Sequence, residues 1–557
     1  MLLSGADILV KTLIEQGCDT VFGYPGGQIL NVYDSLYTHQ NEINHILTAH
    51  EQGAAHAADG YARTTGKVGV VISTSGPGAT NLVTGIATAY LDSIPMVAVC
   101  GNVPTTQIGS DSFQEIDITG VTLPITKHNY FVGKVEDLAD TIREAFVLAK
   151  SGRPGPVLID VPKDVQIAKC EYEPKSPVEK EEPKPAKQLR IEEAAEIINS
   201  ANRPFIYFGG GLITADAQEE MLYLAEKIDA PIGCSLMGLS AIPTDHPRFL
   251  GMQGMHGHFA SSMSMHNADV IISLGVRFND RVTGNRQKFA KGAKIIHIDV
   301  DGSELNKTVN AVCGLRGDVK LTLQKLLPML DESKKSEWMA KVDAFRQEEE
   351  NYLDNRDGLT PRRAILTLNK YLGENTAVCT DVGQHQMWSA QNLNFKTSRR
   401  FASSGGLGTM GYGFGAAIGA AYGTGERSVL ITGDGSFGMN LNELATAVRY
   451  NVPIVVIIIN NGVLGMVRQW QTLFYDKHYS NSVLERKTDF PAFAKAFGAD
   501  GEMVTTPEEL DEALKRAFSY EGPYIVDCKI DKDEFVLPML PPGGSMDDII
   551  TKLEVQE

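Results

Sequence analysis

Asp434 and Asn461 are the side chains whose types and spacing most directly indicate chemistry in this sequence. Asp434 lies in the run Gly433-Asp434-Gly435-Ser436, and Asn461 closes the pair Asn460-Asn461 further along. A carboxylate and an amide oxygen suit a magnesium ion that also takes phosphate oxygens. The glycines let the backbone approach such a phosphate closely. We therefore expect a magnesium and phosphate site; the alternative is a tight turn beside an ordinary Asn-Gly loop.

The segments around these residues predict how they are positioned. Residues 428–432 and 452–459 are short, apolar and β-branched, as strands buried on both faces of a parallel sheet tend to be. Residues 437–451 carry apolar side chains at helical spacing. The resulting order of strand, glycine-rich turn, helix and strand places Asp434 and Asn461 at the carboxyl ends of two strands. Open α/β sheets bind their ligands there.

Glu51 is a third candidate. The run His50-Glu51-Gln52 opens a helix of small residues, 53–62, that is rich in alanine. A carboxylate at the start of such a helix is poorly solvated and holds a proton more readily, as a general acid or base must. The alternative is that an acid in the first turn only complements the helix dipole.

Composition excludes several classes of protein. The net charge of −18 argues against a nucleic-acid partner or an acidic membrane surface, and no run of 18 apolar residues could span a bilayer. Asp7, Lys11 and Glu15 interrupt the first amphipathic helix, so we expect no signal or transit peptide. The seven cysteines are scattered and form no C-x-x-C pair, which favours reduced thiols and a cytoplasmic location.

Alternating strands and helices predict an α/β protein with three consecutive doubly wound parallel-sheet domains. We expect the first domain over residues 1–168, a charged and proline-rich linker over 169–188, and a central domain over 189–335. A charged helical stretch then leads to a third domain with a C-terminal tail over 360–557.

Seven motifs occur in a fixed order: residues 23–27, 50–52, 76–81, 152–156, 383–385, 405–411 and 433–435. This series resembles the thiamin diphosphate-dependent decarboxylases and carboligases. Within that superfamily the chain is similar, over nearly its whole length, to the catalytic (large) subunits of acetohydroxyacid synthase, also called acetolactate synthase. The segments that separate this family from its relatives are residues 111–115, 162–164, 254–257, 274–284 and 465–471. One position departs, because Asn279 stands where the family usually has aspartate.

The resemblance implies a thiamin diphosphate-binding fold, with the aminopyrimidine ring on the first domain and the diphosphate on the third. In this family the two domains come from different subunits, which implies a homodimer or a tetramer. Glu51 would hydrogen-bond the ring nitrogen N1′, and Asp434 and Asn461 would bind Mg²⁺. The further cofactor contacts that the resemblance implies are Gly26, Gly383, Gln384, His385, Gly408, Met410, Gly433, Gly435, Ser436 and Met466. For Met410 and Met466 the alternative is core filling.

The implied reaction decarboxylates pyruvate and joins the remaining two-carbon unit to a second 2-ketoacid, either pyruvate or 2-ketobutyrate. By resemblance, Arg277 would hold the carboxylate of this acceptor and Trp470 would form the wall of its pocket. Phe113, Gln114 and Lys163 would line the entry. The alternatives are surface ion pairs for Arg277 and Lys163, and core packing for Phe113 and Trp470.

The resemblance also implies FAD on the central domain, although the reaction has no net redox step. The corresponding positions are Arg153, His256, Gly257, the segment up to Arg277, Asp299 and Asp318. Flavin-free catabolic acetolactate synthases lack the run that stands here at residues 277–281. We therefore expect a biosynthetic enzyme of the branched-chain amino acid pathway, with a small regulatory subunit as partner.

Three rival readings remain. Pyruvate oxidase, or another flavin-containing thiamin diphosphate enzyme, shares the expected fold. Glyoxylate carboligase fits less well, because it lacks the glutamate found here at position 51. A binding protein that kept the fold and lost turnover is opposed by the intact Glu51, Asp434 and Asn461.

Overall fold

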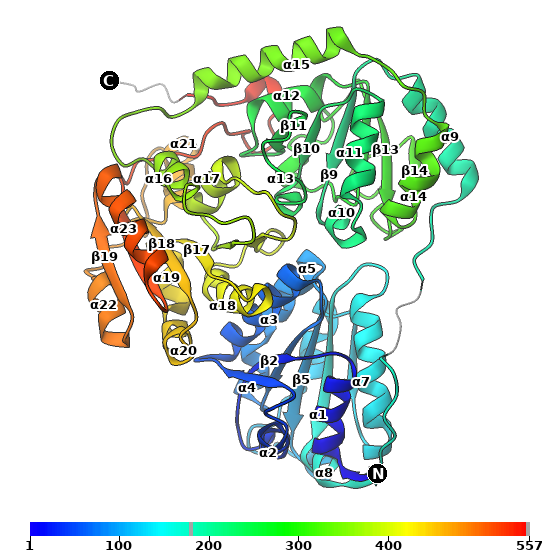
Figure 1. Cartoon of the computed structure of the whole chain (residues 1–557), viewed down its shortest axis with the longest axis vertical. Coiled ribbons are helices and arrows are strands. Elements are labelled where there is room, and N and C mark those ends of the chain that lie inside the picture. The colour runs from blue at the N-terminus through cyan, green and yellow to red at the C-terminus, as the bar shows by residue number, and fades with distance from the viewer. Residues whose placement is uncertain (178–181, 553–557) are drawn as a thin grey trace. The chain divides into compact units, whose positions relative to one another are not determined.

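The computed structural model describes residues 1–177 and 182–552, and contacts divide this part of the chain into two compact units. The first unit contains residues 1–177, 375–386 and 401–532, and the second contains 182–374, 387–400 and 533–552. The first unit holds two six-stranded sheets and the second holds one (Figure 1). All strands in these sheets pair in parallel, which confirms the predicted class of three parallel-sheet α/β domains.

The first domain alternates strands and helices from its N-terminus. Its strands are β2 (Thr20–Tyr24), β3 (Asn44–Leu47), β4 (Gly69–Ser73), β5 (Met96–Asn102), β6 (His128–Phe131) and β7 (Pro156–Pro162). Its helices are α1 (Gly5–Glu15), α2 (Leu30–Thr38), α3 (Glu51–Thr65), α4 (Pro77–Asn81), α5 (Val83–Asp92), α6 (Ile118–Thr122), α7 (Val135–Lys150) and α8 (Lys163–Ile167). The sheet order is β3-β2-β4-β5-β7-β6.

The third domain repeats this topology. Its strands are β15 (Ala377–Thr380), β16 (Phe401–Ser403), β17 (Ser428–Gly433), β18 (Ile454–Asn460), β19 (Asp500–Val504) and β20 (Tyr524–Lys529), in the order β16-β15-β17-β18-β20-β19. Its helices are α18 (Tyr412–Thr424), α19 (Asp434–Asn440), α20 (Leu444–Arg449), α21 (Gly465–Phe474), α22 (Phe490–Phe497) and α23 (Pro507–Ser519). α17 (Gln384–Asn392) begins in this domain, and its residues from 387 onward belong to the second unit. In each of these two sheets the strand that comes first along the chain, β2 or β15, lies between the second and the third strands of that sheet.

The central sheet, in the second unit, is wound differently. Its strands are β9 (Pro204–Phe208), β10 (Ile232–Cys234), β11 (Phe249–Met252), β12 (Val270–Leu274), β13 (Lys294–Asp299) and β14 (Cys313–Arg316), in the order β11-β10-β9-β12-β13-β14. The helices of this unit include α9 (Gln188–Asn199), α10 (Gly210–Ala215), α11 (Gln218–Lys227), α12 (Phe259–Asn267), α13 (Asp280–Thr283), α14 (Val319–Leu326), α15 (Ser336–Glu349) and α16 (Pro361–Leu368). The chain reverses its direction of winding between β9 and β12.

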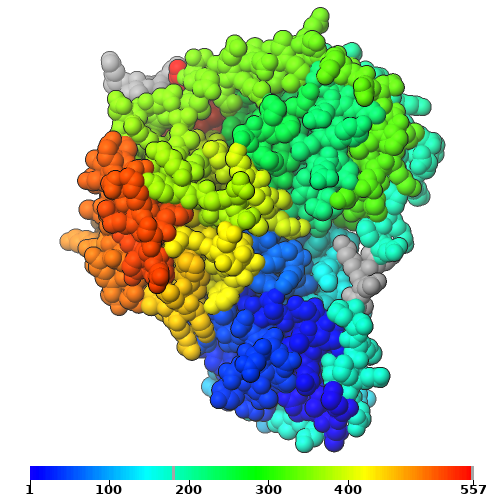
Figure 2. Space-filling view, viewed as in Figure 1, coloured from blue at the N-terminus to red at the C-terminus, as the bar shows by residue number. Residues whose placement is uncertain are grey.

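Alternate residues of the strands in the first unit face two different cores. On β5, for example, Val97 and Val99 pack in a core with α1, α2 and α7. Met96 and Ala98 face the opposite side, in a core that also contains alanines of α3 and α18 and strand residues of the third domain. Helices therefore cover both faces of the sheet. In the space-filling view the yellow residues of the third domain lie directly against the blue residues of the first domain (Figure 2).

Helices α3 and α18 make the closest contact between the first and third domains of the first unit. Ideal Cβ atoms built on Gly60 and Gly419 would overlap the carbonyl oxygens of Ala416 and Ala57. Arg63 near the end of α3 binds Asp59 at 2.5 Å and Asp92 at 2.8 Å. Glycine and alanine thus allow the two backbones to touch, and Tyr412 of α18 joins the buried network by donating its hydroxyl to Asp59 at 2.6 Å.

Two boundaries differ from the expected ones. β8 (Lys169–Glu171) lies within the segment that we predict as linker, and it pairs antiparallel with β1 (Leu2–Ser4). Its sequence, Lys-Cys-Glu, lacks the apolar pattern that identifies a strand. Residues 533–552 belong to the second unit, whereas we predict them as a tail of the third domain. Part of the linker, residues 178–181, lies outside the described residues.

No helix in the described part of the chain combines the length and the apolar character needed to cross a bilayer.

Candidate active site

Asp434 and Asn461 lie beside each other in the third domain, as the sequence predicts. β17 and β18 are paired neighbours, with Gly433 opposite Ile459, and the two residues follow the ends of these strands. Asp434 is the first residue of α19, so the strand passes directly into a helix instead of the expected glycine-rich turn. The predicted helix over residues 437–451 is divided into α19, a 3₁₀ turn (Leu441–Glu443) and α20.

Asp434 is a carboxylate without adequate solvation. Asp434 is 8% exposed, and burial raises the pKa of its carboxyl to about 6. The charge of Lys529 lowers this pKa, and the charge of Asp527 raises it further. A bound cation would favour the charged form of such a carboxylate. Within the described residues no group of three or more His, Cys, Asp or Glu side chains could hold a metal. The donor set of one carboxylate and one amide therefore fits Mg²⁺ that completes its shell with phosphate and water oxygens.

Amide side chains orient Asn461. Its Nδ2 donates to Oε1 of Gln384 at 3.2 Å, and its Oδ1 accepts from the amide of Val463 at 3.2 Å. Gln384 in turn donates to Oε1 of Gln469 at 3.0 Å. The structure thus brings the predicted residue Gln384 to the predicted metal ligand Asn461, and it adds Gln469, which the sequence did not indicate.

His385 lies against the glycines at the same strand ends. An ideal Cβ on Gly383 or Gly433 would come within 2.8 or 2.9 Å of its ring, so a larger residue at either position would displace the imidazole. Burial lowers the pKa of His385 to about 3, and its Nε2 is buried without a hydrogen-bond partner. The other ring nitrogen donates to the carbonyl of Asp381, so Nε2 of the neutral imidazole can accept a hydrogen bond from a ligand at these strand ends. Ser436 uses its hydroxyl to donate to the carbonyl of Val382 at 3.2 Å.

The loop that carries Gly408 and Met410 is held by two buried aspartates. Asp92 accepts from the amides of Gly405 at 3.0 Å and Gly406 at 2.7 Å. Asp381 accepts from the amides of Gly411 at 2.7 Å and Gly413 at 3.1 Å. Sequence reasoning missed both aspartates, although Asp381 directly follows β15, a position comparable to that of Asp434 after β17.

Neither predicted methionine fills a core. Met410 and Met466 are only partly buried, and Gly408 is exposed with φ of +72°. The left-handed backbone at Gly408 favours glycine. An ideal Cβ on Gly435 would approach Leu464 at 2.9 Å and the methyl group of Met410 at 3.9 Å, so Met410 lies near the glycine that follows Asp434.

Glu51 is the first residue of α3 and is 9% exposed. Its Oε2 accepts from Nδ2 of Asn81 at 2.9 Å, and an ideal Cβ on Gly78 would lie 3.2 Å from its Oε1. His50 caps the helix, because its Nδ1 accepts from the amide of Gln52 at 3.0 Å. Gly26 packs so tightly on Thr74 that a Cβ there would overlap the threonine side chain.

The predicted entry residues also lie in the first unit. Phe113 is 83% exposed, which excludes core packing. Gln114 has φ of +61°, and Lys163 donates to the carbonyl of Gly27 at 3.1 Å while forming no ion pair with any described residue. Trp470 is partly buried on α21, with its ring 5.7 Å from that of Phe474 in an edge-on arrangement.

The predicted flavin positions fall mainly in the second unit, and Arg153 lies in the first, where it donates to Ser93 at 2.8 Å. His256 is buried with Nδ1 unpartnered, and burial lowers its pKa to about 4. A Cβ on Gly257 would come within 2.6 Å of the carbonyl of Met252. Two acidic positions already have local roles: Asp299 accepts from the amide of Asp301 at 2.8 Å, and Asp318 caps α14 through Leu321 at 3.0 Å.

The winding of the central sheet indicates where a nucleotide would bind. Ligands of such sheets lie at the strand ends where the winding reverses, here between β9 and β12. Gly209 and Gly211 follow β9, and Cβ atoms on them would come within 2.7 and 2.6 Å of Gly275, which follows β12. Arg277 lies just beyond this contact and is partly buried. The sequence analysis did not identify Gly209, Gly211 or Gly275 as candidates. Their position directly after a buried strand could have indicated them.

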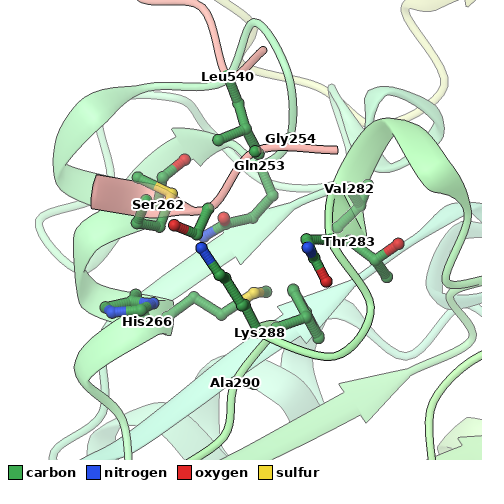
Figure 3. Close-up of a pocket in the computed structure, with 15 residues that line it drawn as sticks. Gln253, Gly254, Ser262, His266, Val282, Thr283, Lys288, Ala290 and Leu540 are labelled. Carbon is green, nitrogen blue, oxygen red and sulfur yellow. The ribbon is translucent and has the colours of Figure 1, made fainter. Parts of the chain in front are cut away.

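A pocket lies within the second unit (Figure 3). Ser262, Met265 and His266 of α12 line it, and all three belong to the predicted flavin segment. Lys288 and Leu540, which lies in the C-terminal segment 533–552, also line the pocket.

Comparison with known proteins assigns this architecture. Three family descriptions match in chain order: "Thiamine pyrophosphate enzyme, N-terminal TPP binding domain" over residues 3–121, "central domain" over 191–326, and "C-terminal TPP binding domain" over 381–528. Such a trio of domains defines the class of thiamine pyrophosphate (thiamin diphosphate) enzymes.

Similar proteins narrow the class. The acetolactate synthase large subunit of Buchnera aphidicola (subsp. Acyrthosiphon pisum) is 43% identical over 571 residues, covering 100% of both chains. The isozyme 3 large subunit of Escherichia coli K12 is 42% identical, covering 98% of both chains. That of Corynebacterium glutamicum is 44% identical, covering 98% of this chain and 90% of its own. The chain belongs to the acetolactate synthase large subunit family and is an enzyme of that kind.

Proposed function

We propose that this chain decarboxylates pyruvate and joins the two-carbon product to a second 2-ketoacid. With pyruvate as acceptor the product is 2-acetolactate, and with 2-ketobutyrate it is 2-aceto-2-hydroxybutyrate, the first common step of valine, leucine and isoleucine biosynthesis. One observation carries the proposal: the first domain has a buried acid at the start of α3, and the third domain has an Asp434–Asn461 oxygen pair at adjacent strand ends. The similarity to acetolactate synthase large subunits supports the choice of reaction and disfavours pyruvate oxidase.

Thiamin diphosphate, when bound, supplies the carbanion chemistry that breaks and forms carbon–carbon bonds next to a carbonyl. Asp434 and Asn461 would hold Mg²⁺, and the buried side chain of His385 at the same strand ends would line the cofactor site. Glu51 would hold and return a proton at the ring nitrogen N1′. The hydrogen bond from Asn81 leaves Oε1 of Glu51 available for that task.

Substrate recognition falls to a second group of side chains. Arg277 would bind the carboxylate of the acceptor through its planar donors. Trp470 would contact the acceptor's alkyl group, and the partial exposure of its ring supports this role. Phe113, Gln114 and Lys163 would line the entry, and the exposure of Phe113 supports such a position.

FAD would bind on the central domain in a structural role. The reversal of winding between β9 and β12, the glycines that follow these strands and the unpartnered Nδ1 of His256 support a dinucleotide there. The reaction has no electron imbalance for a flavin to correct. Synthase activity should therefore survive when a bound 5-deaza flavin replaces FAD.

The relatives are named large subunits, which supports a small regulatory partner for this chain. We further propose a homodimer or tetramer in which the first domain of one subunit and the third domain of another share each cofactor.

Product analysis tests the proposal. Purified protein with thiamin diphosphate, Mg²⁺ and FAD should convert pyruvate to acetolactate and carbon dioxide without oxygen uptake. Added 2-ketobutyrate should divert product to acetohydroxybutyrate. Oxygen uptake that matches carbon dioxide release would instead favour an oxidase, and the absence of carbon dioxide release would favour a binding protein.

A further inference from the structure

The backbone that leads into Glu51 is held by side chains of the third domain of the same chain. Leu47 donates its amide to the hydroxyl of Tyr450 at 3.0 Å. The amides of Ala49 and His50 donate to Oε2 and Oε1 of Glu443 at 3.1 and 3.0 Å. Three amides within four residues, immediately before Glu51, therefore depend on two side chains that lie almost 400 positions further along the chain.

Glu443 is built into this place. Glu443 is 0% exposed, and the hydroxyl of Thr446 donates to its Oε2 at 2.7 Å. It forms no ion pair with any described residue, so two backbone amides and one hydroxyl stabilise it. Gly53, in the first turn of α3, is what admits it: a Cβ at position 53 would overlap the carboxylate of Glu443.

The position of Glu443 in the sequence connects it with the metal site. α19 begins at Asp434, and the 3₁₀ turn that follows this helix ends at Glu443. One short segment thus carries a predicted metal ligand at its start and, at its end, the anchor for the backbone before Glu51. In the proposed dimer these two residues of one chain would serve the two different cofactor sites. A side chain that only joined the two domains would not need to accept hydrogen bonds from the amides of Ala49 and His50, which directly precede Glu51.

We propose that Glu443 is a positioning residue for Glu51, fixing the start of α3 so that the Glu51 carboxylate meets the cofactor ring at the correct place. This inference rests on the proposed role of Glu51 in proton transfer. Displacements of about 1 Å in a reacting group can lower rates by about 100-fold, so an anchor of this kind has catalytic weight.

The first test needs no bound cofactor. Glu443→Gln keeps the shape of the side chain but turns a nitrogen donor toward one backbone amide, so one of two hydrogen bonds is lost. Tyr450→Phe removes only the hydroxyl that Leu47 uses. Hydrogen–deuterium exchange of peptides covering residues 47–53 in the cofactor-free protein should be faster in both variants.

Asp269 offers a matched control in the second unit. Its carboxylate accepts from the amides of Asn202 at 2.9 Å and Arg203 at 2.8 Å, the same arrangement as at Glu443. Asp269→Asn should speed exchange around residues 202–203 and leave residues 47–53 unchanged. Faster exchange at 47–53 in this control would attribute the effect to general loosening and overturn the assignment.

The second test measures proton–deuterium exchange at C2 of thiamin diphosphate with cofactor and Mg²⁺ saturating. Glu443→Gln should slow this exchange by about 10- to 100-fold, Tyr450→Phe should slow it less, and Asp269→Asn should leave it unchanged. Normal exchange at C2 in a Glu443→Gln protein whose 47–53 segment is loosened would overturn the positioning role. Wild-type protein that forms no acetolactate would instead overturn the proposed function, so the two failures are distinguishable.

Discussion

At the scale of single residues, the two carboxylate oxygens of Glu51 have different surroundings. One accepts from Asn81 at 2.9 Å, and the other faces Gly78. We predict that Glu51→Gln slows exchange at C2 of bound thiamin diphosphate by about 10²- to 10⁴-fold, because an amide cannot carry the proton. The melting temperature serves as the control and should change little. Equal exchange rates in variant and wild type would remove Glu51 from the proton path.

Asp434 and Asn461 should contribute unequally to metal binding. Asp434→Ala removes the only charged ligand of the pair and should abolish retention of thiamin diphosphate in Mg²⁺. Asn461→Ala removes a neutral amide and should weaken retention less. Titration of each variant with Mg²⁺ at fixed cofactor concentration measures both effects. An unchanged Mg²⁺ dependence in the Asp434 variant would place the metal elsewhere.

Asp160 makes the stability of the first domain depend on pH. Burial raises its pKa to about 7, and only Oδ2 is hydrogen-bonded, to Asn102 at 2.7 Å. The folded state therefore keeps a proton that the unfolded state loses near pH 4. Between about pH 4 and 7 the free energy of unfolding should fall as pH rises, by at most about 4 kcal/mol.

Asp160→Asn has no proton to lose, so it tests this pH dependence directly. Its melting temperature relative to wild type should rise between pH 5 and pH 8. A constant difference across this range would show that Asp160 does not titrate in the window.

Residues that act next to their own strand could be predicted from the sequence, and residues that act across the fold could not. Asp434, Asn461 and Glu51 each follow a strand, and the local pattern predicted that position in the fold. Asp92 and Glu443 serve backbone amides more than 300 residues away. No local pattern reports such a partner, because the contact arises only when two domains pack.

At the scale of elements, α3 and α18 depend on glycine for their close approach. A methyl group at position 419 would overlap the carbonyl of Ala57. Gly419→Ala should therefore destabilise the protein by about 1–3 kcal/mol, although the same change in an open helix stabilises by about 0.5–1 kcal/mol. Gly133→Ala is the control, since its Cβ would lie 3.7 Å from the nearest atom, in ordinary contact. Urea unfolding of both variants decides the matter, and equal midpoints would contradict tight packing.

Periodicity predicted the strands well and the broken helix poorly. β17 and β18 are buried along their whole length and mostly apolar, as strands covered on both faces of a parallel sheet tend to be. The helix expected over 437–451 ends early at Asn440, whose side chain donates to the carbonyl of Gly411. Because Gly411 is distant in the sequence, the local pattern does not report this contact. The apolar residues therefore keep helical spacing across the point where the helix ends.

At the scale of the whole molecule, one unit is assembled from the two ends of the chain. The first and third domains have the same strand order and share a core. The sequence does not show this shared core, because the central domain separates the two domains along the chain. The proposed sharing of each cofactor between subunits can be tested by complementation. Glu51→Gln and Asp434→Ala proteins should each be inactive alone.

Mixed after dissociation, these two variants should regain about a quarter of wild-type activity. Half of the dimers would then be mixed, and each mixed dimer would contain one intact site. Sites built within single chains would give no recovery, and mixing wild-type protein with either variant controls for subunit exchange.

The shared core of the first unit also sets the order of events on the ribosome. The alanine-rich face of α3 is complete long before α18 exists, because about 350 residues separate the two helices. At about 5–20 residues per second, a nascent first domain waits roughly 20 to 70 s for its partner. During that interval the surface around Ala54 and Ala57 has no native cover, so a chaperone that recognises apolar surface would meet this chain there first.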